Sequence, residues 1–238
     1  MGELTLTAKK SKKGTCTYCG KLKTLTRDHI IPKCLFPAPL PAVMVTVPAC
    51  HDCNNEKSKH DDYLRDMLVV DSNTGENEIA QEMSLGKVRR SASRNLSAVI
   101  RAAKTQGRFQ PVHSKGGIYL GHAFTFPLEV DRVNHIFSQI VRGLYFRLTK
   151  RYLPQDCSFV VRRITAREFN EFWPELEGIG YNGPYRLGDD IFSCLFIYAA
   201  EEPAISQWWL WFYGHNICVM VRTAPATYDI QTLQAAAT

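Results

Sequence analysis

The alternation of apolar and polar positions is clearest in the second half of the chain, where it predicts both helices and strands. Between residues 131 and 151, apolar side chains recur every three or four positions, as on the buried face of a helix. Asp131 is expected to be the N-cap of this helix, which should stop before Pro154. Runs of β-branched and aromatic residues predict further strands. These strands are expected at 116–126, 158–164, 189–200 and 207–223, with a hairpin about 214–216.

A short helix is expected at residues 165–176, broken near Pro174. Strands and helices mixed in this order predict that residues 111–238 form an α+β domain with a mainly antiparallel sheet of about four strands. Trp208, Trp209 and Trp211 occupy neighbouring positions of one strand, which favours core packing over a base-stacking surface. Nothing in this pattern points to a particular function.

In the first half of the chain the expected helices and strands are shorter, and the sequence is more polar. Residues 1–13 are lysine-rich and are expected to be a flexible basic arm. Residues 14–70 contain short β-prone pieces followed by a helix at about 54–68. The polar, acidic and turn-rich segment at 71–78 then marks the expected boundary of this first domain.

Residues 71–110 are expected to link the two halves through a helix at 79–105. On a helical wheel, the apolar positions between 87 and 104 fall within about 120° of one another. The opposite side carries a row of cations: Lys87, Arg90, Arg94, Arg101 and Lys104. No acidic residue occurs from 87 to 110, which favours contact with phosphate groups, although an ordinary solvated helix face is the alternative.

Composition indicates the class of protein and the sign of the charge expected on its partner. The chain has 238 residues, 45% of them hydrophobic, and a net charge of +6, which suits a soluble protein of one large or two modest domains. Residues 1–60 hold ten Lys/Arg against four Asp/Glu, residues 61–86 hold one against seven, and residues 87–110 hold seven against none. Two basic segments flanking an acidic one suggest a polyanionic partner, and by charge alone two ordinary solvated faces are an equal alternative. Without a long apolar run or a secretory signal, we expect a cytoplasmic protein with no membrane partner.

Four of the eight cysteines form two C-x-x-C pairs, Cys16 with Cys19 and Cys50 with Cys53. In a cytoplasmic chain this pairing indicates metal binding rather than disulfides. Four thiolates around Zn²⁺ make a closed tetrahedral site, so the predicted zinc is structural and has no open position for a substrate. The other cysteines are expected to be small buried hydrophobic residues: Cys34, Cys157, Cys194 and Cys218.

Between the two pairs the chain reads RDHIIP, and after Cys53 it continues NNEKS. The order C-x-x-C, D-H-x-x-P, C-x-x-C-N-x-x-K resembles the zinc-stapled branch of the HNH endonucleases, whose fold is the ββα-metal motif. The resemblance covers residues 14 to about 66, roughly a quarter of the chain. It implies that residues 14–70 form an HNH nuclease domain. The role of the α+β domain expected at residues 111–238 stays unassigned.

The resemblance also implies roles for individual residues. His29 would be the general base that takes a proton from the attacking water. Asp28 and Asn54 would bind a catalytic divalent ion, Mg²⁺ or Mn²⁺, through hard oxygen ligands. Lys57 would support the phosphate or the start of the helix. The products expected from DNA are a 5′-phosphate and a 3′-hydroxyl.

The chain departs from the family at one position. The middle asparagine of the family, which braces the loop that holds the histidine, is Val45 here. His60 is out of phase with the expected ligands and is interpreted as a surface residue. Asp61 and Asp62 are interpreted as parts of a solvated helix face, with a role around the metal site as the alternative.

Three functional hypotheses follow. The first is a metal-dependent DNA endonuclease with little sequence preference in its N-terminal lobe, in a setting such as defence or a mobile element. The second is a non-catalytic, zinc-stabilised module that binds nucleic acid. In the third, which is compatible with the first, residues 111–238 mediate homodimerisation or contact a regulatory protein, with the helix at 131–151 as the docking face.

Overall fold

The computed structural model describes residues 12–94, 106–114, 116–125 and 127–228, and within them the fold is α+β with antiparallel sheets. This confirms the expected α+β class with mainly antiparallel sheets. None of the described helices combines the length and apolar content that crossing a bilayer would require.

The N-terminal part is a small sheet followed at once by a long helix. Strands β1 (Lys13–Thr15), β2 (Leu22–His29) and β3 (Thr46–Cys50) pair antiparallel in that order. A 3₁₀ turn, η1 (Lys33–Leu35), lies in the connection between β2 and β3. Helix α1 (His51–Val69) begins directly after β3, because the extended Cys50 serves as its N-cap. The helix thus starts three residues before the expected position, and β1 takes in Lys13 of the expected arm.

The expected linker is mostly helical from residue 72 to residue 94, while its last three residues belong to a strand. A 3₁₀ turn, η2 (Ser72–Thr74), leads into α2 (Glu78–Met83), whose first turn is capped by the Asn77 side chain. A π-helical stretch, η3 (Ser84–Val88), then continues into α3 (Arg89–Arg94). The rest of the expected helix lies outside the described residues.

The C-terminal part is built on a five-stranded antiparallel sheet, one strand more than expected. Its spatial order is β6-β10-β9-β8-β7. The strands are β6 (Ser158–Ile164), β7 (Asn182–Leu187), β8 (Phe192–Tyr198), β9 (Ser206–Phe212) and β10 (Ile217–Ala224). β7 is the strand that the sequence pattern missed.

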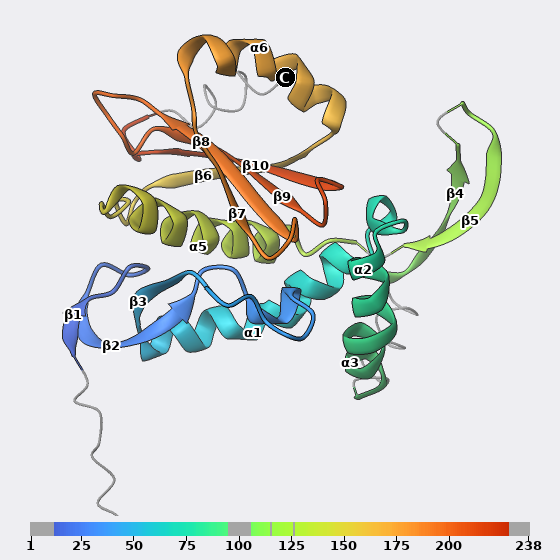
Figure 1. Cartoon of the computed structure of the whole chain (residues 1–238), viewed down its shortest axis with the longest axis horizontal. Helices are drawn as coiled ribbons and strands as arrows, with labels where there is room; N and C mark the ends of the chain where they lie inside the picture. The colour runs from blue at the N-terminus through green and yellow to red at the C-terminus, as the bar shows by residue number, and fades with distance from the viewer. Residues whose placement is uncertain (1–11, 95–105, 115, 126, 229–238) are drawn as a thin grey trace, which may run out of the picture.

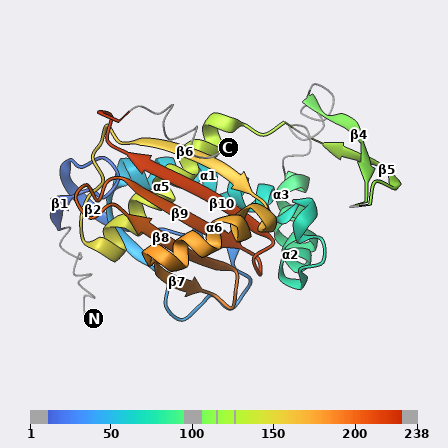
Figure 2. The same cartoon turned by 90° about the horizontal axis from the view of Figure 1, so that it is seen from above.

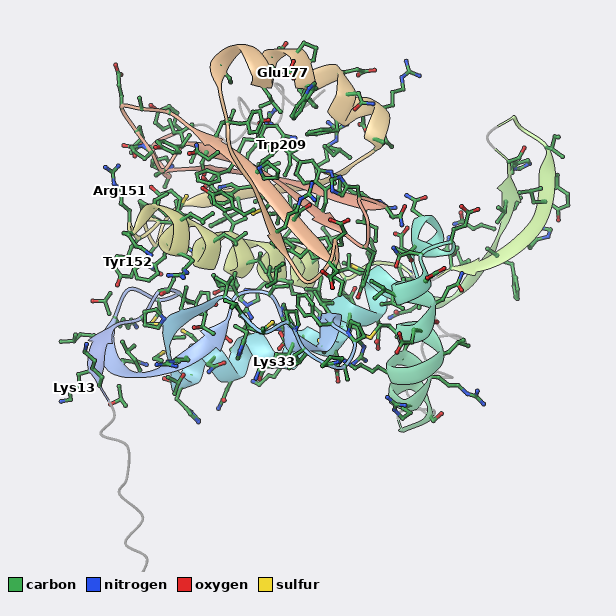
Figure 3. All side chains as sticks on the ribbon, viewed as in Figure 1. Lys13, Lys33, Arg151, Tyr152, Glu177 and Trp209 are labelled. Atoms are coloured by element: carbon green, nitrogen blue, oxygen red, sulfur yellow. The ribbon has the colours of Figure 1, made fainter. Side chains whose placement is uncertain are left out.

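Each face of this sheet is covered by one helix, α5 (Val130–Thr149) on one side and α6 (Ala166–Ile179) on the other (Figures 1 and 2). Side chains of a strand alternate between faces, so Trp208 belongs to the cluster on the α5 side and Trp209 to the cluster beneath α6. Trp209 is fully buried between the sheet and α6 (Figure 3). The preference for core packing of the tryptophans is confirmed.

Two details of the expected helices were wrong. Asp131 is not the N-cap of α5, since Glu129 holds that position and makes no side-chain capping bond. Pro174 does not break α6, which continues to Ile179. Its start is fixed by a reciprocal capping box between Thr165 and Glu168, and tertiary packing on the sheet outweighs the lost backbone hydrogen bond.

The two halves of the chain share one hydrophobic core. Ile30 and Phe36 of the N-terminal part belong to the same buried cluster as Phe137 of α5 and Phe212 of β9. Helix α5 lies between the five-stranded sheet and the layer of α1 and the N-terminal sheet (Figure 1). The apolar face of α5 is therefore covered by the chain itself, and the expectation that it is a docking face was wrong.

One element stands away from this body. Strands β4 (Arg108–His113) and β5 (Tyr119–Thr125) pair with each other alone, as a two-stranded antiparallel ribbon. The ribbon projects beyond α2 and α3 in both views (Figures 1 and 2). Every residue of β4 is exposed to solvent. β4 was also missed by the sequence pattern.

Candidate active site and metal centre

The four cysteines of the two C-x-x-C pairs lie together. Their sulfur atoms are all within 4.8 Å of one another, and Cys19 Sγ is 3.9 Å from Cys50 Sγ. A tetrahedral zinc site with Zn–S bonds of about 2.3 Å would place its sulfur atoms about 3.8 Å apart. The cluster Cys16, Cys19, Cys50 and Cys53 therefore fits a metal such as zinc.

Local backbone geometry places these sulfur atoms. Cys16 and Cys19 lie in the tight turn between β1 and β2, which Gly20 closes in the left-handed conformation with φ 66°. Cys50 and Cys53 are on the N-cap and first turn of α1, and the Cys50 N–H donates to Cys16 Sγ over 3.3 Å. A metal here would join the β1–β2 turn to the start of α1.

His29 is the last residue of β2, opposite Thr46 of β3. The next two residues, Ile30 and Ile31, are fully buried and anchor the chain in the common core. His29 itself is half-buried. Burial lowers the pKa of its imidazole below the ordinary value, and the nearby ammonium of Lys33 acts in the same direction, so the ring is neutral at pH 7.

Asp28 faces the opposite side of β2 from His29 and is buried, with 7% of its surface exposed. The Tyr18 hydroxyl donates a short hydrogen bond to Asp28 Oδ2. The ammonium of Lys57 lies 3.3 Å from the same oxygen. Burial, together with the Asp28 carboxylate beside it, raises the pKa of Tyr18 well above its ordinary value, so Tyr18 stays a donor.

Lys57 and Asn54 join α1 to the end of β2. The Lys57 ammonium, itself buried, donates to the His29 carbonyl oxygen over 2.7 Å. Asn54 Nδ2 donates to Thr26 Oγ1 over 3.0 Å and to the Arg27 carbonyl oxygen over 3.5 Å. The structure therefore brings all four expected catalytic residues to one junction between strand and helix.

The structure also distinguishes Asn54 from its neighbour. Asn55 is exposed, and its amide contacts the His51 ring one turn earlier on α1. Asn54 is turned towards β2, where its amide nitrogen donates to the hydroxyl oxygen of Thr26. The Thr26 hydroxyl donates its own proton to the Ala49 carbonyl oxygen, so its oxygen is free to accept from Asn54. Within the described residues, Asn54 Oδ1 accepts no hydrogen bond.

A hard divalent cation suits the oxygen atoms that remain. Within the described residues, both contacts to the Asp28 carboxylate go to Oδ2, and Asn54 is bonded through its nitrogen, so each residue keeps its Oδ1. Carboxylate and amide oxygens are the ligand types that Mg²⁺ and Mn²⁺ prefer.

At Val45, where the HNH family has an asparagine, a backbone hydrogen bond supports the end of β2. The N–H of Ile30 donates to the Val45 carbonyl oxygen over 3.1 Å, directly after His29. Lys57 holds the carbonyl of His29 on the other side. The end of β2 is thus braced by main-chain and lysine contacts that do not require an asparagine side chain at position 45.

Sequence reasoning missed several residues around this junction. Tyr18 lies in the cysteine turn and carried no signal of its contact with Asp28. His60 is half-buried rather than a surface residue, because Arg132 of α5 donates to its Nδ1 over 3.0 Å and the His135 ring lies 5.4 Å away. No local pattern could reveal a contact across 72 residues.

Asp61 is another departure from the sequence interpretation. Its side chain is half-buried, and burial raises the pKa of its carboxyl above the ordinary value, while the cation of Lys57 acts against this. Asp61 follows Lys57 by one helical turn, so helical periodicity could have placed it on the inner face of α1. Asp62, by contrast, is exposed and pairs with Arg65.

The expected row of cations at 87–104 is only partly described. Lys87 is half-buried, and its ammonium donates to the Phe36 carbonyl oxygen over 2.6 Å, so it supports the fold rather than facing solvent. Arg90 is exposed. Arg94 ends α3, but its side chain is outside the described part, as are Arg101 and Lys104 entirely.

A comparison of the chain with protein-family models, with curated proteins and with solved structures finds no match. The functional interpretation therefore depends on the geometry of the site and on the motifs that compose it.

Proposed function

We propose that this protein is a metal-dependent DNA endonuclease of the HNH type. The observation that carries the proposal is the junction of β2 and α1. There, Lys57 contacts both Asp28 and the His29 carbonyl, and Asn54 is bonded to β2. The β2–β3 hairpin followed by α1 has the order of a ββα-metal motif, and the cysteine cluster suits a structural zinc.

In this proposal each residue has a separate task. His29 accepts a proton from the attacking water, which its neutral ring allows at pH 7. Lys57 fixes the His29 backbone and forms an ion pair with Asp28, and Tyr18 orients the same carboxylate. Asp28 and Asn54 would hold Mg²⁺ or Mn²⁺, which when bound neutralises charge on the phosphate and on the leaving oxygen.

The reaction is hydrolysis of one phosphodiester bond. The water oxygen forms a bond to phosphorus, and the bond from phosphorus to the 3′ oxygen breaks. One proton of the water goes to His29, and the 3′ oxygen takes up a proton from solvent. The products are a 5′-phosphate and a 3′-hydroxyl.

Nicking of supercoiled plasmid with added Mg²⁺ or Mn²⁺ tests the proposal. His29→Ala is expected to slow nicking by about 10²- to 10⁴-fold, the usual contribution of a general base. His51→Ala is a matched control, because His51 is an exposed histidine of the same lobe whose ring contacts the Asn55 amide. Equal nicking by wild type and His29→Ala would contradict the assignment of His29.

One observation favours the second hypothesis, a non-catalytic module that binds nucleic acid. The carboxylate of Asp28 is already paired with a buried ammonium and a hydroxyl, as a purely structural carboxylate would be. This hypothesis predicts DNA binding that needs no Mg²⁺ and that survives His29→Ala. DNA binding without cleavage under any divalent metal would decide in its favour.

A further inference from the structure

The β4–β5 ribbon has two chemically different faces. Cross-strand pairing of Arg108 with Thr125 and of Gln110 with Ala123 places these residues on one face. The opposite face carries aromatic rings that contact one another. Tyr119 lies 5.7 Å from His113 and 5.6 Å from His122 between ring centroids, and its hydroxyl is hydrogen-bonded to His122 Nδ1 at 2.6 Å.

The two faces also differ in what their polar groups do. The rings of the aromatic face are engaged with each other and stiffen a ribbon that has no other sheet to rest on. On the other face, Arg108 and Gln110 are exposed, and within the described residues neither side chain forms a hydrogen bond or an ion pair. Five guanidinium N–H donors and one carboxamide are thus presented together to solvent.

The charge of the surrounding chain limits the kind of partner. From residue 83 to residue 128 the sequence contains eight Lys and Arg and no Asp or Glu, in a chain that has 23 acidic residues elsewhere. The ribbon lies inside this acid-free segment and follows α3. Such a segment complements a polyanion, whereas a second copy of the same cationic ribbon would be repelled.

The dimensions of the ribbon suit one polyanion in particular. Two paired strands are narrow enough to enter the major groove of B-DNA, which is about 12 Å wide. A strand of six or seven residues spans roughly 20 Å, the length of about six base pairs. Arginine and glutamine are the side chains that make bidentate hydrogen bonds to guanine and adenine edges in that groove.

We propose that the β4–β5 ribbon enters the major groove of a DNA duplex and that Arg108 and Gln110 contact base edges there. The ribbon would thereby give a sequence preference to a chain whose zinc-bearing lobe shows no base-reading element. The inference shares its partner, duplex DNA, with the proposed function and depends on that function only to this extent.

Selection of binding sites from a library of random duplexes, without added Mg²⁺ or Mn²⁺, tests the inference on the full chain. Wild type is expected to enrich a motif of about six base pairs or fewer. Arg108→Ala/Gln110→Ala is expected to lose about 10- to 100-fold of the preference for that motif over a scrambled duplex. Its affinity for the scrambled duplex should fall only a few-fold.

Arg167→Ala is the matched control. It removes the same single positive charge from an exposed position on α6, where Arg167 pairs with Glu171, and should leave the preference unchanged. Retention of zinc and of the thermal melting temperature shows that each variant is folded, since Arg108 and Gln110 are exposed and contribute nothing to the core.

The inference is overturned by binding of duplex DNA without any preferred sequence, by an unchanged preference in Arg108→Ala/Gln110→Ala, or by no binding of duplex DNA. A dimer in size-exclusion chromatography that dissociates in Arg108→Ala/Gln110→Ala would assign the ribbon to a second copy of the chain and would also overturn it. Plasmid nicking separates the two proposals. Nicking without sequence preference removes only the inference, whereas a ribbon-dependent preference without nicking removes only the nuclease.

Discussion

The ammonium of Lys57 lies 3.3 Å from Asp28 Oδ2 and 2.7 Å from the carbonyl oxygen of His29. One lysine from the second turn of α1 therefore holds two consecutive residues of β2, one by its side chain and the other by its backbone. Both members of the ion pair are buried, so each charge offsets the energetic cost of burying the other.

The first prediction concerns this pair. Lys57→Ala should lower the free energy of unfolding by about 3–5 kcal/mol, because it leaves the Asp28 carboxylate buried without its cation. Asp28→Asn in the same chain removes that charge and should restore part of the loss. Urea denaturation of wild type, both single variants and the double variant measures the coupling. Strictly additive losses would show that the two side chains do not interact.

The second prediction concerns the cysteine cluster. The purified protein should contain about one zinc per chain by elemental analysis, and Cys50→Ser should reduce the zinc content and the melting temperature together. Cys218→Ala serves as a control, because Cys218 is buried on the α6 side of the sheet, away from the cluster, and should leave the zinc content unchanged. Full stability of the protein after removal of its metal would rule out a structural role.

The third prediction concerns thiols outside the cluster. Burial raises the pKa of Cys34 and of Cys194 to about 12, which disfavours the thiolate. At pH 8 only about one molecule in 10⁴ would carry either thiolate, and the thiolate is the form that reacts. Iodoacetamide should therefore spare both residues in the native protein and modify them in urea, as measured by mass spectrometry. Rapid native labelling of Cys194 would contradict its burial.

The fourth prediction concerns the contact between α5 and the end of β2. A Cβ atom at Gly143 would lie 3.0 Å from Cγ1 and Cγ2 of Ile30, the residue that follows His29. Gly143→Leu should cost about 1–3 kcal/mol through overpacking and should lower nicking, because it displaces Ile30. Gly178→Leu on α6 is the size-matched control, since a Cβ there meets nothing within 4 Å. Thermal melts and the plasmid assay compare the two.

The local sequence pattern was sufficient to predict most helices and strands of this fold. The hairpin of β9 and β10, strand β6 and the body of α5 follow from periodicity, because their apolar positions face a core on a fixed side. β7 was missed because Gly183 and Pro184 interrupt its sequence, which normally argues against a strand. Such residues are tolerated at the edge of the sheet, where β7 lies.

In the candidate site, too, some features could be predicted from the sequence and others could not. The clustering of the two C-x-x-C pairs follows from motif spacing, whereas a common site for Asn54, Lys57 and His29 was expected from the resemblance to the HNH motif. The burial of Asp28 against Tyr18, and the contact of His60 with Arg132, depend on how separate segments pack. No spacing rule fixes such packing, because the partners belong to different elements.

Helix α5 is covered on one side by the five-stranded sheet and on the other by the N-terminal layer, and this arrangement limits how the chain could have evolved from separate parts. In a modular nuclease, the hairpin and helix could be moved to another protein as a self-sufficient cassette. Here, transplanting residues 14–70 would uncover Ile30, Phe36 and Leu64, all fully buried in the common core. The segment that carries the cysteine cluster and the five-stranded sheet would therefore have to be inherited together, as one indivisible unit.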